Sequence, residues 1–124
     1  MKRGAAAPRA APVVRPRIRV TQGSEIVLGP GKADLLDAVR ATGSLRRGAA
    51  ELGMSYMRAW TLVKTMNAAF KAPLVALARG GARHGGATVT PTGAKVLSLY
   101  RAMERTCEMA TSSQAAKLKG LLRR

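Results

Sequence analysis

The junction Gly53-Met54-Ser55 constrains the fold more than any other part of the chain. Apolar residues recur at helical spacing on both sides of it: Leu45, Ala49 and Leu52, then Ala59, Val63, Met66 and Phe70. This spacing predicts two amphipathic helices separated by a tight turn. Ser44 and Ser55 stand where an N-cap hydroxyl would accept a backbone N–H, and a glycine at position 53 permits a positive φ. We therefore expect two short helices that cross closely.

The flanking segments predict a mainly α chain with small β elements. Residues 17–28 alternate around a turn and favour a β-hairpin, and a helix opens at 29–31 and ends at Gly43. Pro73 stops the helix at 55–70, and strands at 74–78 and 87–89 flank a glycine-rich wing at 79–86. Thr90 then caps a long helix at 91–110. This order predicts a winged helix-turn-helix with an N-terminal β-hairpin and a long C-terminal dimerisation helix.

The long helix carries a heptad seam. Apolar residues recur along it at Val96, Tyr100, Met103, Cys107 and Ala110. Such a seam pairs two helices, so we expect these residues to form a homodimer interface. Cys107 is either a small buried residue of that interface or one half of a symmetric disulfide between two copies. We divide the chain into a flexible basic arm at 1–16, the folded domain at 17–110 and a basic tail at 111–124.

Positive charge dominates the composition. Lysine and arginine number 22 against 6 acidic residues, which gives a formal net charge of +16. The stretch from Leu52 to Met103 contains no acidic residue at all. A localised excess of this size attracts polyanions, nucleic acid above all. No apolar run reaches the length of a membrane span, and the N-terminus lacks the apolar core of a secretory leader, so we expect a cytoplasmic protein.

The helix at 55–70 is the predicted recognition helix, because its first turns would enter the major groove of DNA. The residues expected to face DNA from it are Ser55, Tyr56, Met57, Arg58, Trp60, Thr61 and Lys64. Arg58 would bond a guanine, and Trp60 would either stack near DNA or pack against its own domain. Phosphate contacts are expected from Ser44, Arg46, Arg47 and Arg79. At the tip of the wing, Arg83 and His84 would reach the adjacent minor groove, although solvent exposure is an equal alternative for His84.

Several short runs in the sequence resemble one known family. They are Gly43-Ser44-Leu45, Ala49-Ala50, Leu52 to Tyr56, Ala59-Trp60, the glycine-rich run at 80–87 and Thr90 to Gly93. They resemble the N-terminal domain of ModE-type molybdate-responsive transcription regulators and, more distantly, the DNA-binding domains of LysR-type regulators. The resemblance implies a bacterial homodimer on a palindromic operator, with Ser55, Tyr56, Arg58 and Thr61 facing DNA. The molybdate-binding domains of that family lie C-terminal to this region, so molybdate binding is not expected in this chain.

These observations predict a sequence-specific double-stranded DNA-binding transcription regulator in the bacterial cytoplasm, associated with the nucleoid. Two alternatives stay open: a non-specific architectural DNA-binding protein, and a heterodimerising modulator of a larger ModE-like regulator. No cofactor or metal site is expected, and an enzyme is not expected. The chain shows no nucleophile–base pair, carboxylate pair or metal-ligand cluster. The run Gly29-Pro30-Gly31-Lys32 lacks the Ser or Thr that a phosphate-binding loop needs next.

Overall fold

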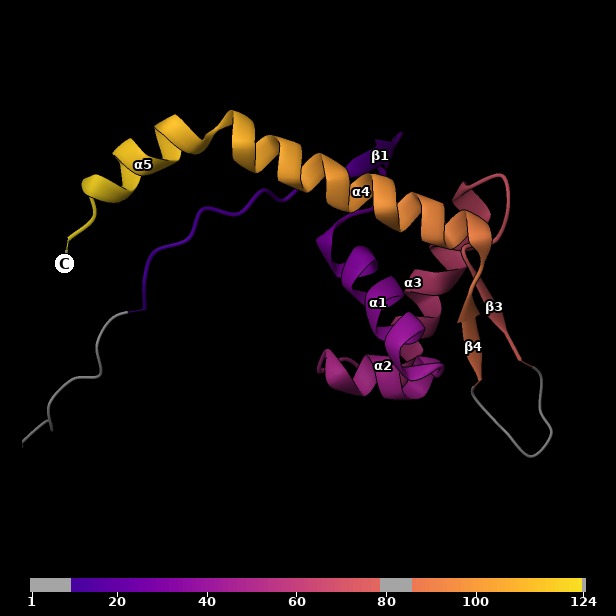
Figure 1. Ribbon diagram of the computed structural model, residues 1–124. Helices are drawn as coiled ribbons and strands as arrows, with labels where there is room; N and C mark the ends of the chain where they lie inside the picture. The colour runs from indigo at the N-terminus through magenta and orange to yellow at the C-terminus, as the bar shows by residue number, and fades with distance from the viewer. Residues whose placement is uncertain (1–9, 79–85, 124) are drawn as a thin grey trace, which may run out of the picture.

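The computed structural model describes residues 10–78 and 86–123. In chain order the elements are β1 (Val20–Gln22), β2 (Glu25–Leu28), α1 (Pro30–Thr42), α2 (Leu45–Glu51), α3 (Tyr56–Ala69), β3 (Val75–Leu77), β4 (Ala87–Val89), α4 (Pro91–Ala110) and α5 (Ser112–Gly120). Figure 1 shows α4 lying across one end of the helical unit, with α2 at the opposite end and α1 and α3 between them. The strands form two separate antiparallel pairs.

The predicted caps set the ends of α2 and α3. The Ser44 hydroxyl accepts a hydrogen bond from the Arg47 N–H at 3.1 Å, and the Ser55 hydroxyl accepts one from the Arg58 N–H at 3.1 Å. Each bond satisfies a helix N–H that has no partner within its helix. Between the helices Gly53 has φ of +68°, a conformation that L side chains rarely adopt. The sequence prediction of two capped helices and a glycine turn is confirmed.

One hydrophobic core joins α1, α2, α3 and α4. It is built from aliphatic side chains and Tyr100: Leu35, Leu36, Val39, Leu45, Ala49, Ala59, Val63, Met66, Leu74, Val75, Leu97 and Tyr100. The stripe expected on the third helix is confirmed at three positions, which are buried, while its last residue, Phe70, is only half-buried. Burial of this kind contributes roughly 25 cal/mol per Å² of apolar surface. The core therefore fixes the crossing of α2 and α3.

Two side chains tie the β3–β4 hairpin to the helices. The Asn67 side chain on α3 accepts hydrogen bonds from the Leu74 and Val75 N–H groups at 2.8 and 3.2 Å, and it donates one to the Val75 carbonyl at 3.0 Å. On the other side, the Thr90 hydroxyl donates to the Pro73 carbonyl at 2.6 Å and caps α4. The start of β3 is therefore held from α3 and from α4 together.

A cluster of charged residues joins α1 to α4, and we call it the Arg101 cluster: Asp34, Asp37, Arg101 and Glu104. The Arg101 guanidinium bonds Asp34 at 2.9 Å, Asp37 at 2.7 Å and Glu104 at 2.9 Å. Partial burial opposes its charge, but the hydrogen bonds that it donates to Asp37, Asp34 and Glu104 outweigh this and raise the Arg101 pKa above its ordinary value. Three of the six acidic residues of the chain are thus engaged by one arginine.

Three details differ from the sequence predictions. The first strand begins at Val20 instead of Arg17, because the Tyr100 hydroxyl donates a hydrogen bond of 2.7 Å to the Ile18 carbonyl and holds that segment against the core. The residues of the predicted seam on the long helix do not share one environment: Tyr100 is 1% exposed in the core of its own chain, and Val96 packs on the same core. Met103 and Ala110 are exposed and Cys107 is half-buried. The tail at 111–124 contains a regular helix, α5, after a break at Thr111.

Candidate anion-binding face

Four basic side chains lie on α2 and α3, and we call them the basic face: Arg46, Arg47, Arg58 and Lys64. All four are exposed. Arg46 and Arg47 lie in the first turn of α2, and Arg58 lies in the first turn of α3, so the two capped helix starts present them. Within the described residues none of the four is ion-paired to a carboxylate. Their positive charge is available to a ligand from solvent.

Two aromatic side chains lie beneath these cations. The Arg46 guanidinium lies 4.5 Å from the centroid of the Tyr56 ring, and the Lys64 ammonium lies 4.7 Å from the centroid of the Trp60 ring. Both rings are half-buried and pack against the core. Cation–π contacts of this kind hold the long basic side chains over the helix surface. For Trp60 the structure therefore shows packing within its own domain.

The remaining predicted contacts are distributed unevenly. Met57 is 63% exposed beside Arg58, and Ser55 is exposed with its hydroxyl occupied as a cap. The Thr61 hydroxyl is also exposed, but it donates a hydrogen bond to the Met57 carbonyl at 3.0 Å within α3. Ser44 is half-buried and forms an isolated β-bridge with Gly86, next to β4. Arg79, Arg83 and His84 lie outside the described residues.

Lys32 belongs near this face, and the sequence analysis did not assign it. It lies in the first turn of α1, and its ammonium donates a hydrogen bond of 2.8 Å to the Ile26 carbonyl of β2. Burial lowers the Lys32 pKa, Glu25 acts to raise it, and the nearby Arg58 guanidinium adds to the lowering. The sequence shows this lysine only as part of Gly29-Pro30-Gly31-Lys32. Its nearness to Arg58 arises from the packing of α3 against β2 and α1.

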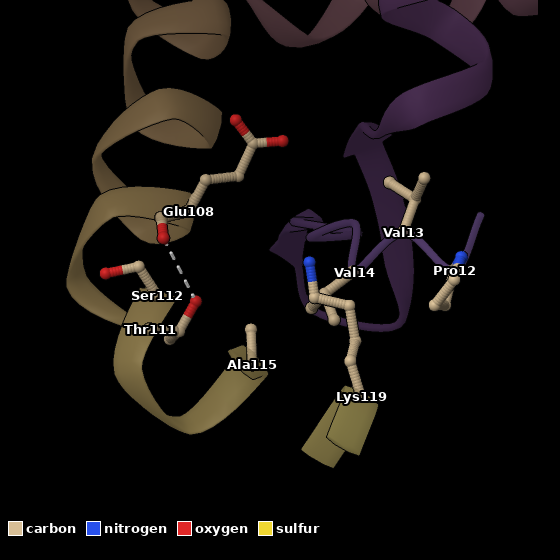
Figure 2. A pocket seen from close by; sticks show the side chains of 8 residues that line it. All are labelled: Pro12, Val13, Val14, Glu108, Thr111, Ser112, Ala115 and Lys119. Atoms are coloured by element: carbon tan, nitrogen blue, oxygen red, sulfur yellow. Dashed lines mark hydrogen bonds between the residues drawn. The ribbon is translucent and has the colours of Figure 1, made fainter. Parts of the chain in front are cut away.

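A second set of hollows lies at the other end of the molecule, between residues 10–17 and the helices α4 and α5. Figure 2 shows one of about 240 Å³, lined by Pro12, Val13, Val14, Glu108, Thr111, Ser112, Ala115 and Lys119. A neighbouring hollow is lined by Arg15 and Arg17 but also by Asp34, Glu104 and Glu108. Carboxylates in both of these hollows oppose an anionic ligand, whereas a third, lined by Ala10, Ala11, Pro12, Lys119, Gly120, Leu122 and Arg123, has none. We take the basic face as the candidate site for an anion because it carries four exposed cations, against the two basic residues of that third hollow.

Neither a metal centre nor a membrane span is found in the part of the chain that the structure describes. Over residues 10–78 and 86–123 no group of three or more His, Cys, Asp or Glu side chains could hold a metal ion. No helix within these same residues is long and apolar enough to cross a membrane. The arrangement of charges at the basic face remains the chemically distinctive feature.

No model of a known protein family matches the chain. It is 43% identical over 77 residues to the molybdenum-pterin-binding protein MopB of Rhodobacter capsulatus, covering 62% of this chain and 28% of that protein. It is 34% identical over 84 residues to the molybdenum transport protein ModE of Azotobacter vinelandii, covering 68% and 31%. It is 31% identical over 97 residues to the DNA-binding transcriptional dual regulator ModE of Escherichia coli, covering 75% and 37%. The chain thus spans about a third of the length of the curated relatives that it matches.

The names of these relatives contradict the ligand that the sequence led us to expect. Two of them, MopB and MopA, are named as molybdenum-pterin-binding proteins. The expectation that molybdate binding is absent from this chain is therefore wrong. The names of MopB and MopA point to a molybdenum ligand, so the assigned function of a sequence-specific, homodimeric double-stranded DNA regulator is corrected as well. The heterodimerising modulator has no support from the same matches.

The family and fold assignments are corrected on the same finding. Similarity to ModE proteins and to transcriptional regulators is shown. The finer assignments, to the N-terminal DNA-binding domain of ModE-type regulators and to the winged-helix class, rested on short sequence runs and are contradicted by the relatives that are named as molybdenum-pterin-binding proteins. Over the described residues the fold consists of five helices and two separate two-stranded sheets.

Proposed function

We propose that this chain acts in a bacterial molybdenum response and that its basic face binds the oxyanion groups of its ligand. The observation that carries the proposal is the set of exposed basic side chains on α2 and α3, none of them ion-paired within the described residues. Tetrahedral oxyanions accept hydrogen bonds from arginine in a planar, two-point geometry. We propose a binding function and no catalysis.

Molybdate is the first candidate source of the oxyanion. The names of the relatives support it, since MopB and MopA are described as molybdenum-pterin-binding proteins and others as molybdenum transport proteins. On this chain a molybdate dianion would be attracted to the capped starts of α2 and α3, where the cations lie. Because these side chains are solvent-exposed, each contact is screened by water and salt, and several must act together.

Phosphate groups of duplex DNA are a second candidate source, favoured by two specific observations. One relative is named a DNA-binding transcriptional dual regulator. In addition, the basic side chains lie spread over an exposed surface of two helices and converge on no enclosed cavity among the described residues. A spread of cations on an open surface suits an extended polyanion, because each phosphate contact also releases counterions.

One experiment with two arms tests the proposal. Sodium molybdate, with sodium sulfate as the matched control, is titrated into the purified protein by calorimetry. A fluorescein-labelled 20-base-pair duplex is titrated by anisotropy from 50 to 200 mM salt. Saturable binding of molybdate in preference to sulfate supports the first source, and duplex binding unaffected by molybdate supports the second. In both arms, substitution of the four basic residues by alanine is expected to abolish binding. Failure of the wild-type protein to bind either probe overturns the proposal.

A further inference from the structure

The helix α5 is regular but contributes nothing to the core. It spans Ser112–Gly120, and none of its residues is buried. The Leu121 and Leu122 N–H groups bond the Leu118 and Lys119 carbonyls at 3.0 and 3.1 Å, so the last turn continues to Leu122. Figure 1 shows α5 projecting from the end of α4, away from α1, α2 and α3. Because a helix of this length is marginal in water without packing, we expect α5 to gain stability from a partner outside the core.

Three leucines make one side of this last turn apolar. Leu118, Leu121 and Leu122 are 57%, 87% and 49% exposed, and their spacing of three and four residues places them on one side of the helix. At about 100° per residue, Lys117 and Lys119 lie to either side of Leu118. A single exposed leucine is ordinary on a protein surface. An apolar side flanked by cations is instead typical of a helix that lies in the surface of a membrane.

Positive charge at this end of the chain is not balanced by acidic residues. No acidic residue follows Glu108 in the sequence. Within the described residues, Lys117, Lys119 and Arg123 form no ion pair with a carboxylate. Lys119 and Arg123 also line a hollow of about 740 Å³, together with one of the leucines and residues 10–12 of the arm. Basic and apolar groups therefore adjoin here, as a charged headgroup and an acyl chain adjoin in a lipid.

We propose that α5 binds the surface of an anionic lipid membrane, with its three leucines inserted below the headgroups and its lysines against them. The inference goes beyond the proposed function and uses a different part of the molecule. A second copy of the chain covering the leucines would bring the like charges of Lys117 and Lys119 together, and duplex DNA offers the leucines no apolar surface. An anionic membrane suits both groups, because its surface potential attracts lysine while its acyl region takes up leucine.

Sedimentation of the full chain with lipid vesicles tests the proposal. Vesicles of phosphatidylcholine with about 30% phosphatidylglycerol are compared with vesicles of phosphatidylcholine alone at about 150 mM salt. We expect binding to the anionic vesicles and none to the neutral ones. Leu118→Gln/Leu121→Gln should weaken the binding about 10- to 30-fold. The matched control is Leu99→Gln/Met109→Gln, a comparably exposed apolar pair on α4, which should stay within about twofold of wild type.

The leucine variant separates insertion into the membrane from attraction by charge alone. A chain with a net charge of +16 adheres to an anionic surface whether or not its leucines insert. Lys117→Gln/Lys119→Gln should weaken vesicle binding about 10-fold and leave binding of the labelled duplex within about twofold. Unchanged vesicle binding in the leucine variant, or an equal loss in the α4 control, overturns the proposal. Failure of the wild-type protein to bind anionic vesicles also overturns it, while the proposed function at the basic face stays intact.

Discussion

The basic face and the Arg101 cluster use the same kind of side chain in opposite ways. Arg101 is 28% exposed and bonds three carboxylates from α1 and α4, so its charge is neutralised by ion pairs that join the two helices. Arg46, Arg47, Arg58 and Lys64 lie exposed on α2 and α3 and are held over aromatic rings or left in solvent. In the Arg101 cluster the cation is paired with carboxylates, and we call this the closed region. In the basic face no cation is paired with a carboxylate within the described residues, and we call this the open region.

The difference shows why total charge is a poor guide to function in this chain. A net charge of +16 says that most cations are unpaired, but it does not say which of them lie together. Acidic residues are concentrated on α1 and α4, and α3 has none. The arrangement engages the charges of one end in internal contacts and leaves those of the basic face exposed, where we propose that an anionic ligand binds.

The largest effect is expected from charge reversal on the open region. Replacing Arg46, Arg47 and Arg58 together by glutamate places like charges against an incoming anion. We expect binding of either probe to weaken by at least about 100-fold, with the thermal midpoint changed by only a few degrees. Calorimetry and anisotropy measure the first quantity, and thermal denaturation the second. Retained binding in this variant would place the ligand elsewhere on the molecule.

In the closed region we expect the opposite outcome, a loss of stability with probe binding retained. Arg101→Met leaves Asp34, Asp37 and Glu104 close together without their cation, and we expect the free energy of unfolding to fall by about 1–3 kcal/mol. Probe affinity should stay within about twofold of wild type. Urea denaturation checks the stability, and Arg105→Met, an exposed arginine of the same helix, is the matched control. Weakened probe binding without loss of stability would contradict the division into two regions.

A smaller effect is expected at Ser55, the N-cap of α3, because it supports both the helix and the position of Arg58. Ser55→Ala removes the hydroxyl that accepts the Arg58 N–H, and this should cost about 1 kcal/mol of stability. Because Arg58 lies in the turn so capped, we also expect a loss of affinity, of about two- to threefold. Ser55→Asp restores the cap but introduces a negative charge. It should recover stability in urea and lower affinity further, and recovery of both would count against an electrostatic ligand contact.

The smallest effect is expected at Tyr100. Burial raises the pKa of its hydroxyl, and the carboxylate of Glu104 acts in the same direction. The folded state therefore keeps the proton at a pH where the unfolded chain releases it, so this contribution is present below about pH 10 and is lost as the pH rises. Tyr100→Phe should lower stability by about 0.5–1 kcal/mol at neutral pH, through the lost bond to the Ile18 carbonyl. By urea denaturation at pH 7.5 and 10.5, a difference that grows at the higher pH would contradict this.

Local features of the fold could be predicted from the sequence because neighbouring residues determine them. The serine caps at 44 and 55, the glycine turn at 53 and the Thr90-Pro91 start of α4 lie where the residue types require them. The start of β1 could not be predicted, because it depends on a hydrogen bond from Tyr100, 82 residues further along the chain. The burial of Tyr100 and the packing of Val96 on the core of their own chain could not be predicted for a related reason, and the dimer contact of the other seam residues stays a prediction. Helical periodicity shows that a face is apolar, but not whether it meets its own core or a second chain.

The candidate site was only partly predictable. Arg58 and Lys64 were assigned because they lie on the predicted recognition helix within an acid-free run, and Arg46 and Arg47 because they lie at the start of the preceding helix. Lys32 was missed, because only the packing of α1 and β2 on α3 brings it near Arg58. The ligand was also misjudged. Short sequence runs suggested an operator and no molybdate, whereas relatives such as MopB and MopA are named as molybdenum-pterin-binding proteins.

The central claim, that oxyanions bind at the open region, is tested most directly by mapping the ligand on the protein. The backbone amides of the ¹⁵N-labelled chain are followed by NMR while sodium molybdate, and separately the 20-base-pair duplex, is added. With at least one of the two probes, we expect shifts confined to the starts of α2 and α3. Amides around Arg101 should not move. Shifts centred on α4 around Arg101, or no saturable shift with either probe, would contradict it.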